Sequence, residues 1–204
     1  MANIQNVDYE AIPGKASNMR ETGRQLNNEL DMIYQKIAGM HNAWYGKRYH
    51  SLVVAFNNMI PQLNELLDLV VGEIPFALET VANNYSRVDQ GTDVVGANRE
   101  AIKKVAELTL PTDVGMKFVT SEVSGVQQEV SAAFEKSKEY MNIFETRFNE
   151  VQWESEAAEK FKSQFITLKN NIVASFEQIK GDFVKLMTEA QNDIQSAESA
   201  NTVQ

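Results

Sequence analysis

Few side chains in this sequence could act on a proton or a metal ion, and two of them flank one tryptophan. His41 and His50, the two histidines of the chain, stand on either side of Trp44. Imidazole binds metal ions and exchanges protons near neutral pH. A closed metal site, however, needs about four ligands at fitting positions, and no carboxylates accompany these histidines at matching spacing. We therefore expect solvated histidines in a turn and no metal site.

Other signatures of catalysis or nucleic-acid binding are missing from the sequence. It has no glycine-rich phosphate loop, no nucleophile elbow and no Glu-x-x-His pair of the di-iron bundles. Cysteine is absent, which excludes disulfides and a thiol nucleophile. The net charge of −9, with 28 acidic against 19 basic residues and no basic cluster, disfavours the phosphate backbone of nucleic acid. We expect neither an enzyme, nor a cofactor, nor a nucleic-acid partner.

A second candidate pair is Tyr85 and Asp89. Four residues apart on a helix, they would share one face one turn apart, as a docking epitope for a partner requires. The alternative interpretation is a tyrosine of an apolar seam beside a solvated aspartate.

The elements that must position these residues are long amphipathic helices. Apolar or small residues recur every three or four positions in a first segment and, beyond the Trp44 turn, in a second one. The first seam is Tyr9, Ile12, Ala16, Met19, Gly23, Leu26, Leu30, Ile33, Ile37 and Met40; the second begins Tyr49, Leu52, Phe56 and ends Leu78, Val81, Tyr85, Val88. Pro13 places the start of the first helix close to itself. The short connection predicts an antiparallel hairpin.

Two prolines interrupt the second helix. Pro61 and Pro75 each remove a backbone hydrogen bond and crowd the preceding turn, so we expect bends, or a break near Gly72 to Pro75. Residues 90–111 then lose the seam and form a connector, in which Asn98 to Leu108 could make a short helix.

The second half repeats the pattern of the first. It opens at Thr112 and Asp113, both competent N-caps, and ends in a polar stretch, Ser199 to Gln204, that we expect to fray. The predicted fold is all-α: two antiparallel helical hairpins, residues 1–89 and 112–204, packed in tandem as an elongated four-helix bundle. We expect a monomer, an intramolecular pseudo-dimer in which the two hairpins pair with each other. A dimer would mean swapped hairpins or an exposed seam.

The two hairpin turns share one arrangement. Trp44 is followed by Gly46, and Trp153 by Ser155, where the second helix of each hairpin must begin. Glycine and serine are both accepted at an N-cap. The simplest interpretation of each tryptophan is a hydrophobic lid on the hairpin tip.

This duplicated pattern resembles the Trp-Xaa-Gly (WXG) family, the early-secreted-antigen-like substrates of type VII secretion. Trp44-Tyr45-Gly46 lies midway along a helical hairpin, and Trp153-Glu154-Ser155 looks like a second copy with serine in place of glycine. Tyr85 and Asp89 match the family's Tyr-x-x-x-Asp/Glu export signal, and Ile194 and Glu198 stand at the equivalent positions of the second copy.

The resemblance implies a non-enzymatic protein that is secreted without a Sec signal peptide and acts through protein–protein contacts. Family members pair antiparallel, which implies two composite ends: Tyr85 and Asp89 with Trp153, and Ile194 and Glu198 with Trp44. The implied partners are the secretion ATPase and, as alternatives, another WXG-like protein or a larger secreted toxin. The Tyr85 end, with its intact signal, is the one that we expect the ATPase to recognise.

Two alternatives stay open. The most apolar stretch, Leu66 to Leu78, could insert into a membrane as in a helical pore-forming toxin, although core packing is the simpler interpretation. The chain could also act as a chaperone-like partner of a larger toxin.

Overall fold

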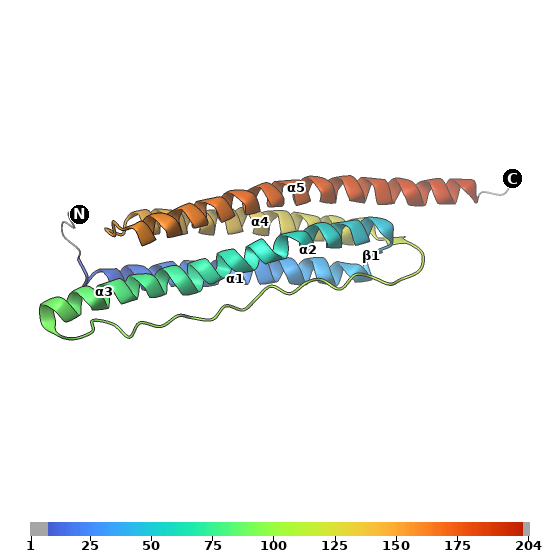
Figure 1. Cartoon of the computed structure of the whole chain (residues 1–204). Coiled ribbons are helices and arrows are strands. Elements are labelled where there is room, and N and C mark those ends of the chain that lie inside the picture. The colour runs from blue at the N-terminus through green and yellow to red at the C-terminus, as the bar shows by residue number, and fades with distance from the viewer. Residues whose placement is uncertain (1–7, 202–204) are drawn as a thin grey trace. The chain divides into compact units, whose positions relative to one another are not determined.

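The structure is a computed structural model that describes residues 8–201. It contains the helices α1 (Ile12–Gly39), α2 (Lys47–Leu67), α3 (Ile74–Gln90), α4 (Thr120–Asn149) and α5 (Glu156–Ala200) (Figure 1). A 3₁₀ turn, η1 (Met40–Asn42), and a π-helical segment, η2 (Asp68–Glu73), complete the helical part. Two short strands, β1 (Trp44–Tyr45) and β2 (Lys117–Phe118), pair antiparallel.

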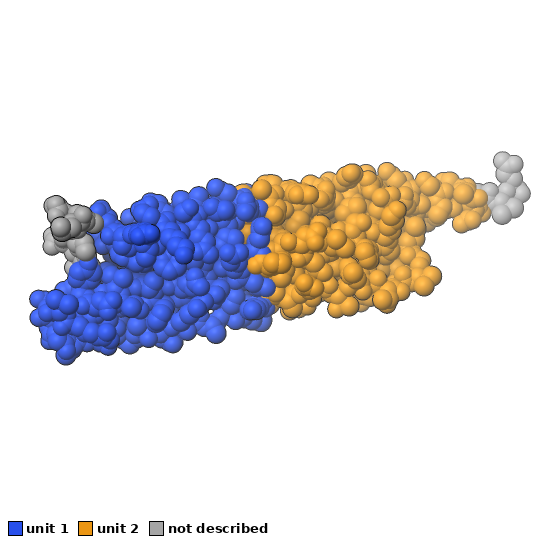
Figure 2. Space-filling model, viewed as in Figure 1, with its two compact units in different colours: residues 1–28, 62–104, 137–171 blue, residues 29–61, 105–136, 172–204 orange. Residues whose placement is uncertain are grey.

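The chain is all-α, as its seams predict, and its helices pack as a four-helix bundle. They contribute to two compact units, coloured separately in Figure 2. Unit 1 comprises residues 1–28, 62–104 and 137–171; unit 2 comprises residues 29–61, 105–136 and 172–204. Because α1 and α2–α3 form one hairpin and α4 and α5 the other, each unit takes helical segments from both hairpins.

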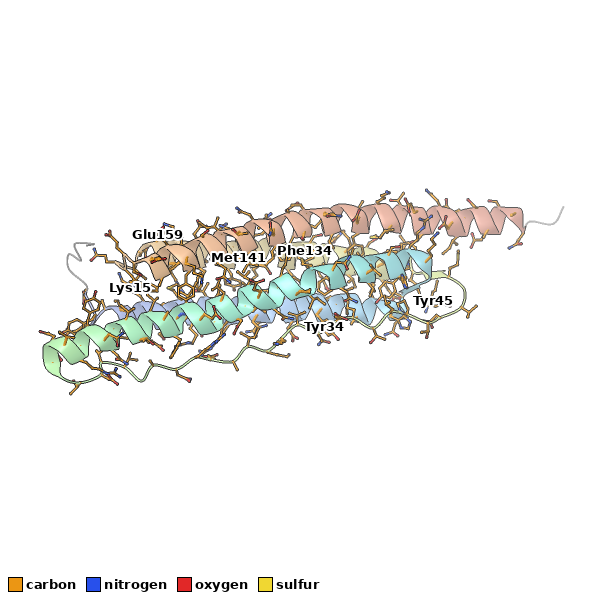
Figure 3. All side chains as sticks on the ribbon, viewed as in Figure 1. Lys15, Tyr34, Tyr45, Phe134, Met141 and Glu159 are labelled. Atoms are coloured by element: carbon orange, nitrogen blue, oxygen red, sulfur yellow. The ribbon has the colours of Figure 1, made fainter. Side chains whose placement is uncertain are left out.

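The predicted seams supply the interior of each unit. All predicted residues of the first seam from Ile12 to Met40 are buried. The core of unit 1 includes Met19, Leu63, Leu67, Met141, Phe144 and Phe165, and that of unit 2 includes Ile33, Leu52, Phe56, Phe134, Phe176 and Phe183. In Figure 3 the labelled Phe134 and Met141 lie among the side chains between the helices. Phe134 and Phe176 stack with ring centroids 4.4 Å apart.

The two prolines have different effects. Pro61 lies inside α2, which continues past it to Leu67. Pro75 stands in the first turn of α3, directly after the π-helical segment η2, and it has no N–H to donate to a carbonyl of that segment. The disturbance predicted near Gly72 to Pro75 is therefore a six-residue π-helix rather than a broken chain.

The connector corrects two expectations. Asn98 to Leu108 does not form a short helix: it is extended, because side chains of the neighbouring helices take up its backbone N–H and C=O groups. Thr112 and Asp113 do not cap a helix either, since α4 begins only at Thr120. Between Asp113 and the start of α4, Gly115 adopts a φ of 102°, and β2 pairs with β1.

The chain end was expected to fray from Ser199. Ser199 and Ala200 still belong to α5, and residues 202–204 lie outside the described part. Residues 1–7 lie outside it as well.

We predict opposite effects for alanine at two glycines. Gly46 has a φ of 111°, and an added Cβ would lie 3.1 Å from the Gly115 carbonyl oxygen, so Gly46→Ala should lower the free energy of unfolding by about 1–3 kcal/mol. Gly125, inside α4, has no atom within 4 Å of an added Cβ, so Gly125→Ala should raise it by about 0.5–1 kcal/mol. Urea unfolding followed by circular dichroism measures both. Equal effects of the two changes would contradict the assigned turn geometry.

Candidate functional site

The residues singled out by sequence fall into one group in each unit. Unit 1 contains Tyr85, Asp89, Trp153 and Ser155, and unit 2 contains Trp44, Gly46, Ile194 and Glu198. The residues that the resemblance assigns to one composite end thus belong to one unit.

In unit 2, Trp44 lies in the interior of the hairpin tip, with 1% of its surface exposed. Its ring stacks on that of Phe183, with the ring centroids 6.0 Å apart. It meets the Phe118 ring edge-on at 5.4 Å and lies tilted against the Tyr49 ring at 5.8 Å. Such aromatic pairs each add about 0.5–1.5 kcal/mol beyond burial. Burial also raises the pKa of Tyr49 to about 12, and its hydroxyl donates to the Ile37 carbonyl at 2.8 Å. Trp44 is thus a core residue of the tip.

The strand pair closes this tip. Trp44 is opposite Phe118, and the Val119 N–H donates to the Ala43 carbonyl at 2.9 Å. Gly46 follows β1 and accepts the His50 N–H on its carbonyl at 3.0 Å, which starts α2. Sequence analysis missed this sheet, because a two-residue strand has no periodicity to detect.

Ile194 lies close to Trp44. Both line a cavity of about 40 Å³. Arg48 lines the same cavity and pairs with Glu189 at 2.6 Å and with Asp193 at 3.1 Å. Glu198, one turn beyond Ile194, is exposed on α5.

The histidines differ from each other. His50 is exposed, whereas His41 has its Nε2 atom 2.5 Å from an oxygen of Asp113, and this hydrogen bond lowers the pKa of Asp113. His41 therefore joins the end of the connector to the tip instead of being merely solvated. It also lines a cavity of about 370 Å³ with Tyr34 and Tyr49. Among residues 8–201 no three His, Asp or Glu side chains gather as a metal site would require.

In unit 1, Tyr85 and Asp89 lie on the last turns of α3, one turn apart. Tyr85 is half-buried and Asp89 is exposed. The Tyr9 hydroxyl donates a hydrogen bond to the Asp89 carboxylate and accepts one from Gln90 at 2.9 Å. The bond to Asp89 raises the pKa of Tyr9. Asp89 therefore already has a partner from the start of the chain, which the Tyr85 pattern alone does not reveal.

Trp153 and Ser155 belong to the turn between α4 and α5. Ser155 is the N-cap of α5. Its Oγ accepts a hydrogen bond from the Ala158 N–H at 3.1 Å, and its carbonyl oxygen accepts one from the Glu159 N–H at 3.1 Å. Trp153 is half-buried, with its ring 6.1 Å from that of Phe161. Unlike Trp44, it presents part of its ring to solvent.

The apolar stretch Leu66 to Leu78 is mostly interior to unit 1. Leu66, Leu67, Leu69, Val70, Val71, Ile74 and Leu78 are each at most 2% exposed, and only Phe76 reaches 37%. None of the described helices is both long and apolar enough to span a membrane. In this fold the stretch supplies core residues of unit 1.

Unit 1 also contains a set of side chains that the sequence analysis missed. We call Arg20, Asn27, Glu79 and Asn83 the connector clamp, because each bonds the main chain of residues 94–103. The Asn83 amide oxygen accepts the N–H groups of Val94 and Val95, both at 3.0 Å, and its nitrogen donates to the Val95 carbonyl at 2.8 Å. The Asn83 amide thus holds a bend of the main chain at residues 94 and 95.

The rest of the clamp continues along the connector. Glu79 accepts the Asn98 N–H at 3.1 Å, and Arg20 donates to the Asn98 carbonyl at 3.0 Å. Arg20 and Glu79 also form a 2.7 Å ion pair, with side chains 13% and 5% exposed. Asn27 donates to the Lys103 carbonyl at 2.9 Å.

Charge pairs reinforce this docking. Arg24 bonds both carboxylate oxygens of Glu100, at 2.8 and 2.5 Å, and Arg87 binds Asp93. In unit 2, Asn57 makes the same kind of paired amide contact, with both the N–H and the carbonyl of Leu108. Sequence pattern could not single out these residues, since polar side chains beside a seam are normally solvated.

We predict that acid loosens the connector of unit 1. Arginine contacts hold the pKa of Asp93 and of Glu100 below their ordinary values of 3.8 and 4.5. A carboxyl whose pKa is lowered by folding stabilises the native contacts above its unfolded value, and this contribution is lost as pH falls through the folded value. Amide exchange of residues 93–104, corrected for its intrinsic rate, should therefore accelerate below about pH 4.

The matched control is the double variant Asp93→Asn and Glu100→Gln. Its exchange in residues 93–104 should be faster at pH 7 and depend less on acid, while α4 and α5 behave as in the unmodified chain. Protection of the connector that persists unchanged to pH 2.5 would contradict the prediction.

No family model, no curated protein and no solved structure matches the chain.

Proposed function

We propose that this chain is a non-enzymatic protein exported by a type VII-like secretion system, in which the Tyr85 end of unit 1 is the recognition epitope. The proposal goes back to the resemblance of its two Trp turns to WXG proteins. One structural observation supports it. Tyr85 and Asp89 stand on one face of the final turns of α3, in the same compact unit as the half-exposed Trp153.

The contrast between the two ends supports choosing unit 1. At the other end Ile194 replaces the tyrosine, and Trp44 is 1% exposed within its aromatic cluster. A buried tryptophan can hardly contact a partner, whereas Trp153 still offers part of its ring. Aromatic side chains with exposed edges are favoured anchors in protein interfaces.

The proposed partner is therefore a secretion ATPase that docks on the Tyr85 face. A second WXG-like protein or a larger secreted toxin would be a cargo companion, as in the chaperone-like alternative. The membrane-active alternative receives no support from Leu66 to Leu78, because that stretch is interior.

We predict that Tyr85→Ala and Asp89→Ala each reduce export at least tenfold. The reason is the loss of an aromatic anchor or of the carboxylate one turn away. The measurement is the ratio of secreted to cellular protein for the tagged full chain in a bacterium with an active type VII system, and in its ATPase-deficient derivative.

Two controls separate recognition from folding. Tyr9→Phe removes the hydrogen bond to Asp89 but keeps the carboxylate, so export should persist. Glu198→Ala changes the corresponding acid of the second copy and should have no effect. Unchanged export of both Tyr85→Ala and Asp89→Ala, or an equal loss in Tyr9→Phe, would contradict the proposal.

A further inference from the structure

The connector clamp is built to recognise main chain rather than particular side chains. Asn83 and Glu79 are each only 4% exposed, yet both direct polar atoms at backbone groups of residues 94–98. Buried polar side chains of this kind are costly unless each has a partner. A polypeptide main chain, which supplies both donors and acceptors, is the ligand that satisfies them.

Gly72 supports the same interpretation. The Glu100 carbonyl oxygen lies against it, and a Cβ added at this position would be only 2.9 Å from that oxygen. Any side chain here would push the connector away from the π-helical segment η2. The groove therefore has a glycine where a bound main chain passes closest.

The clamp also has a charge preference. Arg99 bonds Asp68 at 2.7 Å and Glu73 at 2.9 Å, so η2 provides an acidic pair for a basic residue. The next residue, Glu100, bonds Arg24 on α1. The groove thus fits an extended segment with a basic residue directly followed by an acidic one.

The present occupant is held less firmly than the helices. Its main-chain bonds go to side chains instead of a continuous backbone ladder, so residues 93–104 can open without unfolding α1 or α3. An empty clamp would leave Asn83 without its main-chain partners, whereas Glu79 would keep its ion pair with Arg20. Opening is therefore favoured when another segment takes the place of the connector.

We propose that the connector clamp of unit 1 is a binding site for an extended segment of a partner protein, one with adjacent basic and acidic residues, and that residues 93–104 block it in cis. The complementary charges of η2 and α1 define this partner chemistry. A tethered occupant competes at an effective concentration in the millimolar range, so the partner must bind tightly or displace the connector in concert with a second contact. The proposal goes beyond export and does not depend on it.

The test weakens the occupant and leaves the clamp intact. In the double variant Arg99→Glu and Glu100→Arg, both connector charges oppose their partners on η2 and α1, while every clamp residue is unchanged. The probe is a fluorescein-labelled synthetic peptide with the sequence of residues 92–105. Fluorescence anisotropy should show at least tenfold tighter binding of this peptide to the double variant than to the unmodified chain.

Matched controls test the mode of binding. Adding Asn83→Ala to the double variant should weaken peptide binding at least tenfold. A peptide in which the residues at positions 99 and 100 are exchanged should bind to the double variant at least tenfold more weakly than the original peptide does. Circular dichroism checks that helix content is retained, which is expected because Arg99 and Glu100 lie on the non-helical connector.

Three outcomes would overturn the proposal. The first is no peptide binding to the double variant, and the second is binding that ignores Asn83→Ala. The third is a concentration-dependent dimer of the unmodified chain that the free peptide dissociates, which would assign the second occupant to another copy of this chain.

Discussion

One narrow apolar seam on each long helix is the constraint on which the rest of the structure depends. A helix with a single apolar stripe gains stability only when other helices cover that stripe, and each large side chain buried in this way contributes about 1.5–3 kcal/mol. Each compact unit meets the requirement with helical segments from both hairpins. The polar faces remain available for recognition.

The connector meets the opposite requirement. It has too few apolar residues to form a core, so its backbone groups must find partners on the helices. In unit 1 the amide of Asn83 and the ion pair of Arg20 and Glu79 provide them, and in unit 2 Asn57 does so. Polar contacts to its main chain hold this segment together with the buried side chains of Val105 and Leu108.

The two Trp turns show how similar patterns reach different structures. Ser155 caps α5 with its side chain, whereas Gly46 adopts a left-handed conformation beside Gly115. The difference arises because β2, which follows the connector, pairs with the residues just before Gly46. As a result Trp44 is enclosed by Phe118 and Phe183, while Trp153 stays half-exposed. Two tryptophans of like sequence context thereby differ in burial.

The sequence by itself determined the helical class, the seams from Ile12 onwards and the disturbance before Pro75, because each depends on local periodicity or on the missing N–H of proline. It also placed Ser155 where α5 begins. Only the tertiary structure decided that Asn98 to Leu108 is extended, that α4 starts at Thr120, and that Tyr9 bonds Asp89. The physical reason is that these outcomes depend on partners distant in the chain: a buried amide such as Asn83 acquires its role only when folding brings another backbone against it.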